Sequence, residues 1–274
     1  MLCYFHKTRW LLVASFSLLF HLHPLLQPLR GESSWPQWRG AQGTGVSQET
    51  DIPVKWNRGQ VRWRTRIPGR GQSSPVAEGG RIFLTTAAAD GKARSVVCIE
   101  QQTGKILWQR QAVQDAPETV HPMNSWATPS CAADGTRVMA YFGNGGLYCF
   151  DYRGQRLWHR NLGRLTNNRW GVGSSPILSG DDVIQTCDGD NDAFLVAVER
   201  ATGKIRWRQP RRKSRGFSTP LLVEVDQRQE LVLNGHFGVH AYNPQTGSEL
   251  WFCEGGSGRG TPSVTSGHNL IFAI

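Results

Sequence analysis

From residue 61 onward, short runs of apolar positions alternate with turns rich in glycine, asparagine and aspartate. Runs such as 95–100 and 193–199 are short and almost wholly apolar, which is typical of β-strands whose side chains point alternately to two buried faces. The turns, for example 143–146 and 188–192, supply residue types that adopt positive φ angles. No segment after residue 33 has a helical period. The pattern therefore predicts an all-β protein.

A long-period repeat organises these strands. Five tryptophans mark it, with separations of 45, 50, 49 and 44 residues: Trp63, Trp108, Trp158, Trp207 and Trp251. A second marker, a proline that follows a serine or threonine, keeps the same spacing at Pro75, Pro129, Pro176, Pro220 and Pro262. A period of this length, with four short strands in each unit, is typical of β-propeller blades.

Each unit also carries a turn just before its tryptophan. The copies are CIEQQTGKILW (98–108), CFDYRGQRLW (149–158), AVERATGKIRW (197–207) and AYNPQTGSELW (241–251). A single four-stranded sheet cannot bury both of its faces, so such units stack side by side and close into a ring. We expect each repeat tryptophan to lie on an outer strand and to dock its blade on the next one. The glycines of these turns are expected to relieve a tight bend.

The first 33 residues precede this pattern and predict a signal peptide. Basic residues stand before the uncharged run 11–20, and a pair of small residues places the cleavage site near Ser33. A membrane-spanning helix needs about 20 apolar residues, so an uncleaved anchor is the weaker alternative. We expect an exported protein, periplasmic or extracellular, with no transmembrane span after cleavage. The predicted parts are a signal peptide (1–33), a lead-in segment (34–60) and a partial propeller (61–274).

The tryptophan copies and the Ser/Thr-Pro markers resemble those of the quinoprotein-like β-propellers, the repeat family named after pyrroloquinoline quinone (PQQ). The segment WPQWRGAQGTGVSQETDIPVKW (35–56), together with NSWATPS, YFGNGGLYCFD and RWGVGSSPIL, is similar to the secreted, single-propeller branch found in bacterial envelopes. The resemblance implies an eight-bladed ring of four-stranded blades. Counted from a lone outer strand at Trp63, the chain holds about four and a half blades. The open strand edges of such a partial ring are expected to favour self-association.

Two functions remain open on this resemblance. Enzymes of the family carry an adjacent Cys-Cys pair, calcium-binding acids and an aspartate base, and this chain has no adjacent cysteines. Cys98 and Cys149 instead occupy one repeat position in successive units, which predicts a place in the core. We therefore predict a non-catalytic binding or scaffold propeller of the cell envelope, with no cofactor and no metal. The alternative is a PQQ-dependent alcohol or sugar dehydrogenase with calcium, whose catalytic residues lie beyond Ile274.

The charge of the chain indicates the kind of partner. Its 31 Lys and Arg against 21 Asp and Glu give a net charge of +10, which favours anionic partners. For an exported protein, an envelope protein or an anionic polymer is expected rather than nucleic acid. The run PRRKSRG (210–216) concentrates four of the basic side chains. We interpret it as a solvated loop, with an anionic polymer or a lipid surface as the functional alternative.

Arginines and aromatic residues recur shortly before the proline that opens each unit. In a propeller the opening strand lines the central channel, so these loops are expected to gather at one mouth. The predicted ligand funnel consists of Arg70, Trp126, Arg169, Trp170, Arg215, Phe217 and Arg259. Guanidinium groups bind carboxylates and phosphates, and aromatic rings stack on planar groups, so the hypothesis is capture of an anionic small molecule or polymer end. Solvated loop arginines are the alternative.

One acidic turn resembles part of a calcium-binding loop. Asp188, Asp190 and Asp192 are followed by Glu199 at the matching distance, but Ala193 stands where that loop requires glycine. The flanking residues predict strands rather than helices. We interpret this segment as a hairpin turn.

Overall fold

A computed structural model of the chain describes residues 34–50, 52–114, 117–255 and 260–274. The predicted signal peptide, residues 1–33, lies outside the described residues, and so does Arg259 of the predicted ligand funnel. Within the described part, no helix is long and apolar enough to cross a membrane.

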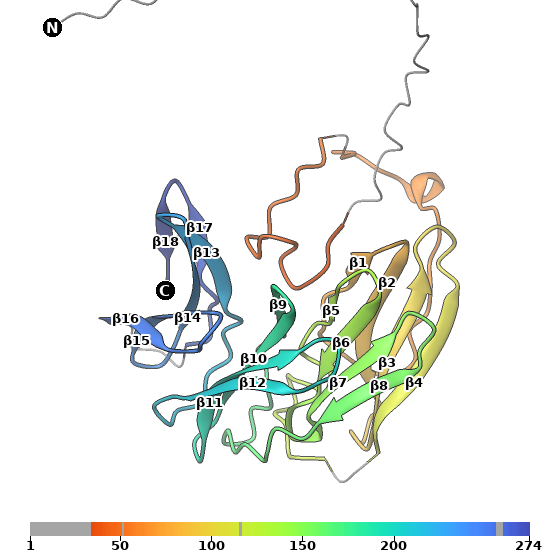
Figure 1. Cartoon of the computed structure of the whole chain (residues 1–274). Coiled ribbons are helices and arrows are strands. Elements are labelled where there is room, and N and C mark those ends of the chain that lie inside the picture. The colour runs from red at the N-terminus through yellow and green to blue at the C-terminus, as the bar shows by residue number, and fades with distance from the viewer. Residues whose placement is uncertain (1–33, 51, 115–116, 256–259) are drawn as a thin grey trace, which may run out of the picture. The chain divides into compact units, whose positions relative to one another are not determined.

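Four antiparallel four-stranded sheets and one two-stranded sheet follow one another along the chain, each with its strands in chain order (Figure 1). The first sheet contains β1 (Val76–Glu78), β2 (Arg81–Ala87), β3 (Ala93–Glu100) and β4 (Ile106–Gln114). The second contains β5 (Ala132–Ala133), β6 (Arg137–Tyr141), β7 (Leu147–Asp151) and β8 (Arg156–Arg160). The third contains β9 (Ile177–Ser179), β10 (Asp182–Asp188), β11 (Ala193–Glu199) and β12 (Ile205–Pro210).

The fourth sheet contains β13 (Leu221–Val225), β14 (Arg228–Asn234), β15 (Gly238–Tyr242) and β16 (Glu249–Glu254), and the last contains β17 (Thr265–Gly267) and β18 (Leu270–Phe272). Two single 3-10 turns, η1 (Arg58–Gln60) and η2 (Gly143–Gly145), are the helical elements of the described residues. The all-β prediction and the partial propeller of four-stranded blades are confirmed.

The hydrophobic core is divided among the gaps between neighbouring sheets. In β6, Val138 and Ala140 pack in the core shared with the first sheet, whereas Met139 and Tyr141 pack in the core shared with the third. Successive side chains of a strand point to opposite faces, so both faces of the sheet are buried. The second sheet therefore depends on two neighbours for its burial.

Four of the repeat tryptophans dock their segment on the following sheet by one recurring contact. The indole N–H donates to a backbone carbonyl in the outer turn of that sheet: Trp63 to Gln101 (2.9 Å), Trp108 to Tyr152 (2.9 Å), Trp158 to Arg200 (2.9 Å) and Trp207 to Pro244 (3.1 Å). The indole of Trp251 instead donates to Oε2 of Glu230 in its own sheet, at 2.7 Å.

A glycine of the same turn lies against each of these four rings: Gly104, Gly154, Gly203 and Gly247. Their φ angles lie in the left-handed region, for example +72° at Gly203. A Cβ atom at Gly203 would stand 2.7 Å from Cδ2 of Trp158, which is inside van der Waals contact. Glycine is thus required for the backbone conformation and for the approach of the ring.

The lone outer strand expected around Trp63 does not form as a strand. Residues 61–67 pair with no described strand, because a strand needs a hydrogen-bonded neighbour and none lies beside this segment in the described part. Side chains hold the segment instead: besides the indole contact of Trp63, the hydroxyl of Thr65 donates to the Gly104 carbonyl.

The predicted lead-in segment crosses the inner strands of successive sheets. Trp35 exchanges two backbone hydrogen bonds with Ala77 on β1, at 2.7 and 2.9 Å. The carbonyl of the next residue, Pro36, accepts from the Ala133 amide on β5, at 2.7 Å. These contacts attach the start of the lead-in to the first two sheets.

The same segment continues over the remaining sheets. Oε1 of Gln37 accepts from the amide of Leu178 on β9, at 2.8 Å. Gly43 lies against Leu221 at the start of β13, because a Cβ atom at Gly43 would stand 2.8 Å from Cδ1 of that leucine. We call residues 35–43 the strap. It ties together inner strands that are far apart in the sequence.

We predict that Gly203→Ala destabilises the protein more than Gly163→Ala. Gly163 also has a positive φ of +92°, but nothing lies within 4 Å of its Cβ position. Gly163→Ala should cost about 1 to 2 kcal/mol of unfolding free energy from the left-handed backbone alone. Gly203→Ala should cost roughly a further 1 to 3 kcal/mol because the ring of Trp158 must move. Urea denaturation followed by circular dichroism measures both, and equal losses would show that the indole contact contributes nothing.

Candidate functional site

Hydroxyl groups near the repeat prolines join the inner segments of neighbouring sheets. The backbone amide of Ser74 donates to Oγ of Ser130, that of Ser130 to Oγ of Ser175, that of Ser175 to Oγ1 of Thr219, and that of Thr219 to Oγ of Ser263, at 2.8 to 2.9 Å. We call the four accepting residues, Ser130, Ser175, Thr219 and Ser263, the hydroxyl ladder. One bond geometry thus recurs from sheet to sheet on the channel side of the fold.

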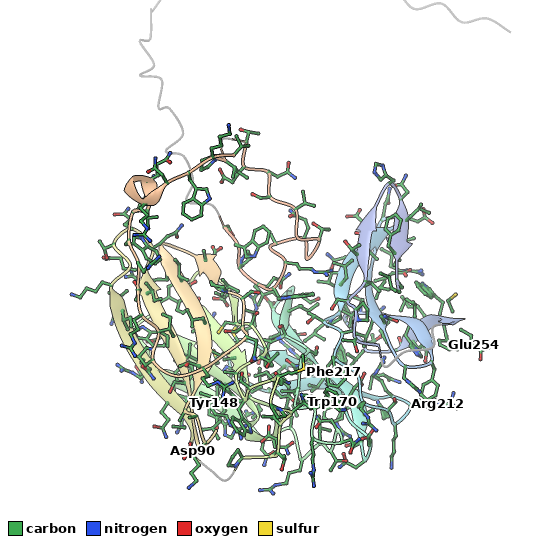
Figure 2. All side chains as sticks on the ribbon, turned by 180° about the vertical axis from the view of Figure 1, so that it is seen from behind. Asp90, Tyr148, Trp170, Arg212, Phe217 and Glu254 are labelled. Atoms are coloured by element: carbon green, nitrogen blue, oxygen red, sulfur yellow. The ribbon has the colours of Figure 1, made fainter. Side chains whose placement is uncertain are left out.

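A cavity of 370 Å³ opens beside these inner segments. It is lined by His121, Met123, Asn124, Trp170, Phe217 and Thr261, and we call it the mouth cavity. The ring of His121 stacks on the indole of Trp170, with centroids 4.5 Å apart and planes 16° apart. Trp170 and Phe217 lie close together in Figure 2. The cavity offers flat aromatic surfaces with a few polar groups at the edge.

A strained turn presents Trp170 to this cavity. Asn168 and Arg169, directly before it, have φ angles of 47° and 67°, a left-handed conformation that non-glycine residues seldom adopt. The side-chain amide of Asn124 donates to the Trp170 carbonyl, at 2.6 Å, and fixes the turn from the neighbouring loop. Such strained positions recur at functional sites.

Two of the seven residues of the predicted ligand funnel, Trp170 and Phe217, therefore lie together in one cavity. Trp126 lies elsewhere: its indole N–H donates to the carbonyl of Glu118 and its ring covers Gly91. Sequence reasoning missed His121 and Asn124, because they stand in a loop of irregular length, and it used Thr261 only as part of the repeat marker at Pro262.

The predicted arginines do not form one ring of free guanidinium groups in the described part. Arg215 Nε donates to Oδ1 of Asp190, at 2.9 Å, so an acid neutralises its charge. Arg70 is exposed, and its backbone pairs with Ala87 at the end of β2. Arg169 is also exposed, on the turn described above. Capture of an anion by a ring of arginines remains a prediction.

The interpretation of PRRKSRG as a solvated loop is wrong for Arg211. This side chain is only 6% exposed, and its Nε lies 3.0 Å from Oδ1 of Asp188, itself 5% exposed. A second guanidinium nitrogen donates to the hydroxyl of Tyr242 on β15. Burial raises the pKa of the Asp188 carboxyl, and the guanidinium of Arg211 offsets part of the rise. This buried pair ties the third sheet to the fourth.

The acidic turn is occupied by arginines. The ion pairs are Asp188 with Arg211, Asp190 with Arg215, Asp192 with Arg208, and Glu199 with Arg206. A cation at this turn would have to displace these partners. Across residues 34–50, 52–114, 117–255 and 260–274, no three His, Cys, Asp or Glu side chains come together as a group able to hold a metal ion.

The buried cysteines are not arranged as nucleophiles. Cys98 and Cys149 are buried free thiols on β3 and β7, in the cores between successive sheets. Burial raises the pKa of each thiol to about 12. They are therefore protonated at neutral pH, whereas the thiolate is the reactive form.

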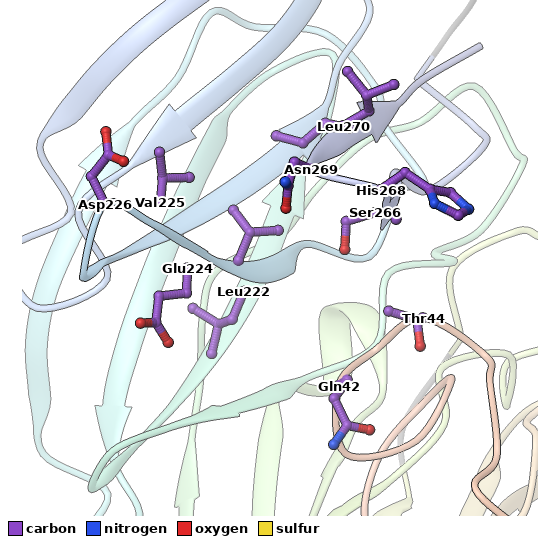
Figure 3. Close-up of a pocket in the computed structure, with 13 residues that line it drawn as sticks. Gln42, Thr44, Leu222, Glu224, Val225, Asp226, Ser266, His268, Asn269 and Leu270 are labelled. Carbon is purple, nitrogen blue, oxygen red and sulfur yellow. The ribbon is translucent and has the colours of Figure 1, made fainter.

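A wider hollow of 790 Å³ lies between the hairpin of β13 and β14 and the hairpin of β17 and β18 (Figure 3). Leu222 and Leu270 line it together with Glu224 and Asp226. Gln42, at the end of the strap, lies at its border. It shares no lining residue with the mouth cavity.

The repeat contacts and the channel lining define a PQQ-like β-propeller. The family model described as outer membrane protein assembly factor BamB matches residues 41–186 and 150–272. The chain belongs to this family.

A curated relative and several solved structures are similar to the chain. Outer membrane protein assembly factor BamB of Legionella pneumophila (strain Paris) is 27% identical over 204 residues, which are 73% of this chain and 48% of the relative. A europium-containing methanol dehydrogenase has a TM-score of 0.59 at 13% identity and is covered to 49%, with 81% of this chain aligned. The quinohemoprotein alcohol dehydrogenase of Comamonas testosteroni has a TM-score of 0.56 at 15% identity, over 85% of this chain and 43% of that one.

The chain thus spans about half the length of the curated relative and less than half of each of these solved structures. The structural likeness shows a shared fold. PQQ with calcium does not fit the mouth cavity as its described residues line it, because none of them is a carboxylate, the ligand that calcium prefers.

We predict that Arg211→Met lowers the unfolding free energy by about 3 to 5 kcal/mol, because it leaves the Asp188 carboxylate buried and unpaired. The matched control is Lys213→Met, an exposed neighbour in the same loop, which should change stability by less than about 0.5 kcal/mol. Urea denaturation at several pH values measures both.

The sign of the pH dependence follows from Asp188. Without its partner the folded-state pKa of this carboxyl rises further above its unfolded value, so the folded state binds the proton more tightly. The Arg211→Met variant should therefore lose stability as the pH rises through that folded pKa and regain it as the pH falls. A loss that is the same at every pH would contradict this account.

Proposed function

We propose that this chain is an exported, non-catalytic binding propeller of the cell envelope, which holds a segment of a partner protein at the mouth cavity. The observation that carries the proposal is the cavity of 370 Å³ in which Trp170, stacked on His121, lies beside Phe217. Aromatic surfaces of this kind bury an apolar or aromatic side chain with a favourable stacking contribution.

The polar edge of the cavity supports a polypeptide ligand. Thr261 brings a hydroxyl to the lining, and Asn124 is held there by its bond to the Trp170 carbonyl. A bound segment places one side chain among the rings and leaves its backbone near these polar groups. The strained turn before Trp170 keeps the ring in place before binding, which lowers the ordering cost.

Membership of a family described as an outer membrane protein assembly factor supports the location and the class of partner. An outer membrane protein has strands that alternate aromatic or apolar residues with polar ones. One aromatic side chain of such a strand matches the cavity in size and polarity. The predicted signal peptide agrees with a protein that meets these partners after export.

The second candidate is a PQQ-dependent alcohol or sugar dehydrogenase. The solved structures named methanol dehydrogenase and alcohol dehydrogenase favour it through the shared fold. The described lining of the mouth cavity counts against it, because that lining supplies no calcium ligand. Absorbance of the protein after incubation with PQQ and calcium, followed by gel filtration, separates the two candidates. Quinone that stays with the protein would overturn the binding-propeller proposal.

The direct test is titration calorimetry with a synthetic peptide that alternates phenylalanine or tyrosine with serine and threonine. Trp170→Ala should weaken binding at least tenfold, because a central aromatic residue of an interface commonly contributes more than about 1.4 kcal/mol. The matched control is Trp56→Ala, a tryptophan that is 69% exposed on the lead-in segment and should leave binding unchanged. Equal affinity of the Trp170→Ala variant and the parent chain would refute the proposal.

A further inference from the structure

The strap delivers one arginine to the inner side of the sheets. Arg39 has a φ angle of 63°, and the bond from the Gly40 amide to the Gln37 carbonyl, at 2.9 Å, closes the tight turn around it. Its guanidinium lies 4.4 Å from the centroid of the Trp38 ring and donates to the carbonyl of Val264, at 3.4 Å. A left-handed arginine held by a stacked ring is a pre-positioned cation.

Arg39 shares a cavity with the whole hydroxyl ladder. This cavity has a volume of 290 Å³ and is lined by Trp38, Arg39, Ser130, Ser175, Thr219 and Ser263, among others. We call it the channel cavity. The four hydroxyl residues come from four consecutive inner segments. The arginine comes from the strap, more than ninety residues before Ser130 in the sequence.

The hydroxyl ladder has hydrogens left to donate. The oxygen of each ladder residue accepts a backbone amide, as shown above, so its own hydrogen points in another direction. Within the described residues, none of the four donates that hydrogen to a protein acceptor. Ser130, Ser175 and Thr219 are 1 to 3% exposed, and a buried donor without an acceptor is unfavourable.

The remaining lining makes the cavity a place for an anion. The described lining contains no carboxylate side chain. The side-chain carbonyl of Gln72, an acceptor in the lining, is already taken by the hydroxyls of Ser125 and Thr128. The cavity thus has a guanidinium group and several hydroxyl hydrogens without acceptors, and no carboxylate competes for them. These donors suit the oxygens of a carboxylate or a phosphate ligand. The small volume favours a small molecule over a polymer segment.

We infer that the channel cavity is an anion-binding site, in which Arg39 and the hydroxyl ladder hold the carboxylate or phosphate group of a small molecule. The site does not rest on the proposed protein-binding function, since its ligand groups come from the strap and the ladder. It explains why the lead-in crosses the inner strands with an arginine at its turn. The site uses one arginine and four hydroxyls, none of which belongs to the ligand funnel predicted from the sequence.

The test is titration calorimetry of the whole chain with succinate and, separately, with inorganic phosphate, in a low-salt buffer. We expect heat with at least one of the two anions, and the anion that binds identifies the group recognised. Arg39→Ala should weaken that binding at least tenfold. Arg39→Lys should recover part of it, because it restores the charge but not the two-pronged geometry. Ser175→Ala should weaken it several-fold.

The matched control is Arg62→Ala, which removes an exposed arginine from the segment after the lead-in and should leave binding unchanged. Urea denaturation of each variant shows whether it is folded, and Arg39→Lys keeps the test valid if Arg39→Ala is unstable. The inference is overturned if neither anion binds, if Arg39→Ala binds like the parent chain, or if Arg62→Ala weakens binding as much as Arg39→Ala. Peptide binding should survive Arg39→Ala, so failure here is distinct from failure of the proposed function.

Discussion

The burial of both faces of the middle sheets is the constraint on which the rest of the structure depends. Alternate residues of a middle strand such as β6 belong to two different cores, so no sheet is stable without its neighbours. Two bonds fix how neighbours meet: an amide-to-hydroxyl bond at the inner strands and an indole-to-carbonyl bond at the outer turns. With both ends of a sheet fixed, the rotation between blades is set, and the inner loops keep their places relative to one another.

This fixed inner frame allows strained and charged groups to be held in place. The turn of Asn168 and Arg169 costs free energy, and so does the left-handed Arg39, yet both are anchored by bonds to a neighbouring loop or sheet. Buried arginines also link segments of this inner frame. Arg94, 1% exposed, pairs with Glu118 and donates to the Phe142 carbonyl, and Arg211 pairs with Asp188. Each is stable in the core because a carboxylate pairs with it there.

Ion pairs between arginines and acidic residues also affect which arginines are available to bind a ligand. The position of Arg215 before a repeat proline led us to expect a guanidinium group at the channel mouth, but Asp190 pairs with it, and in the same loop Asp188 pairs with Arg211. The groups that we propose for binding are the rings of the mouth cavity and, on the strap, Arg39. Positive charge in the sequence thus indicates a class of partner without locating the site, because the acids that neutralise it are distant in sequence.

The sequence alone determined the repeat, the strand count of each blade, the turn glycines and the family, because these follow from spacing and from the two-residue period. Two funnel residues, Trp170 and Phe217, could be predicted because they stand six and three residues before a repeat proline. The hydroxyl ladder stands at repeat positions beside the prolines, but the bonds that its oxygens accept from neighbouring segments were visible only in the structure. The strap and the buried ion pairs were not predictable, because they join residues such as Gln37 and Leu178 that have no periodic relation, and only the stacking of sheets in space brings such residues together.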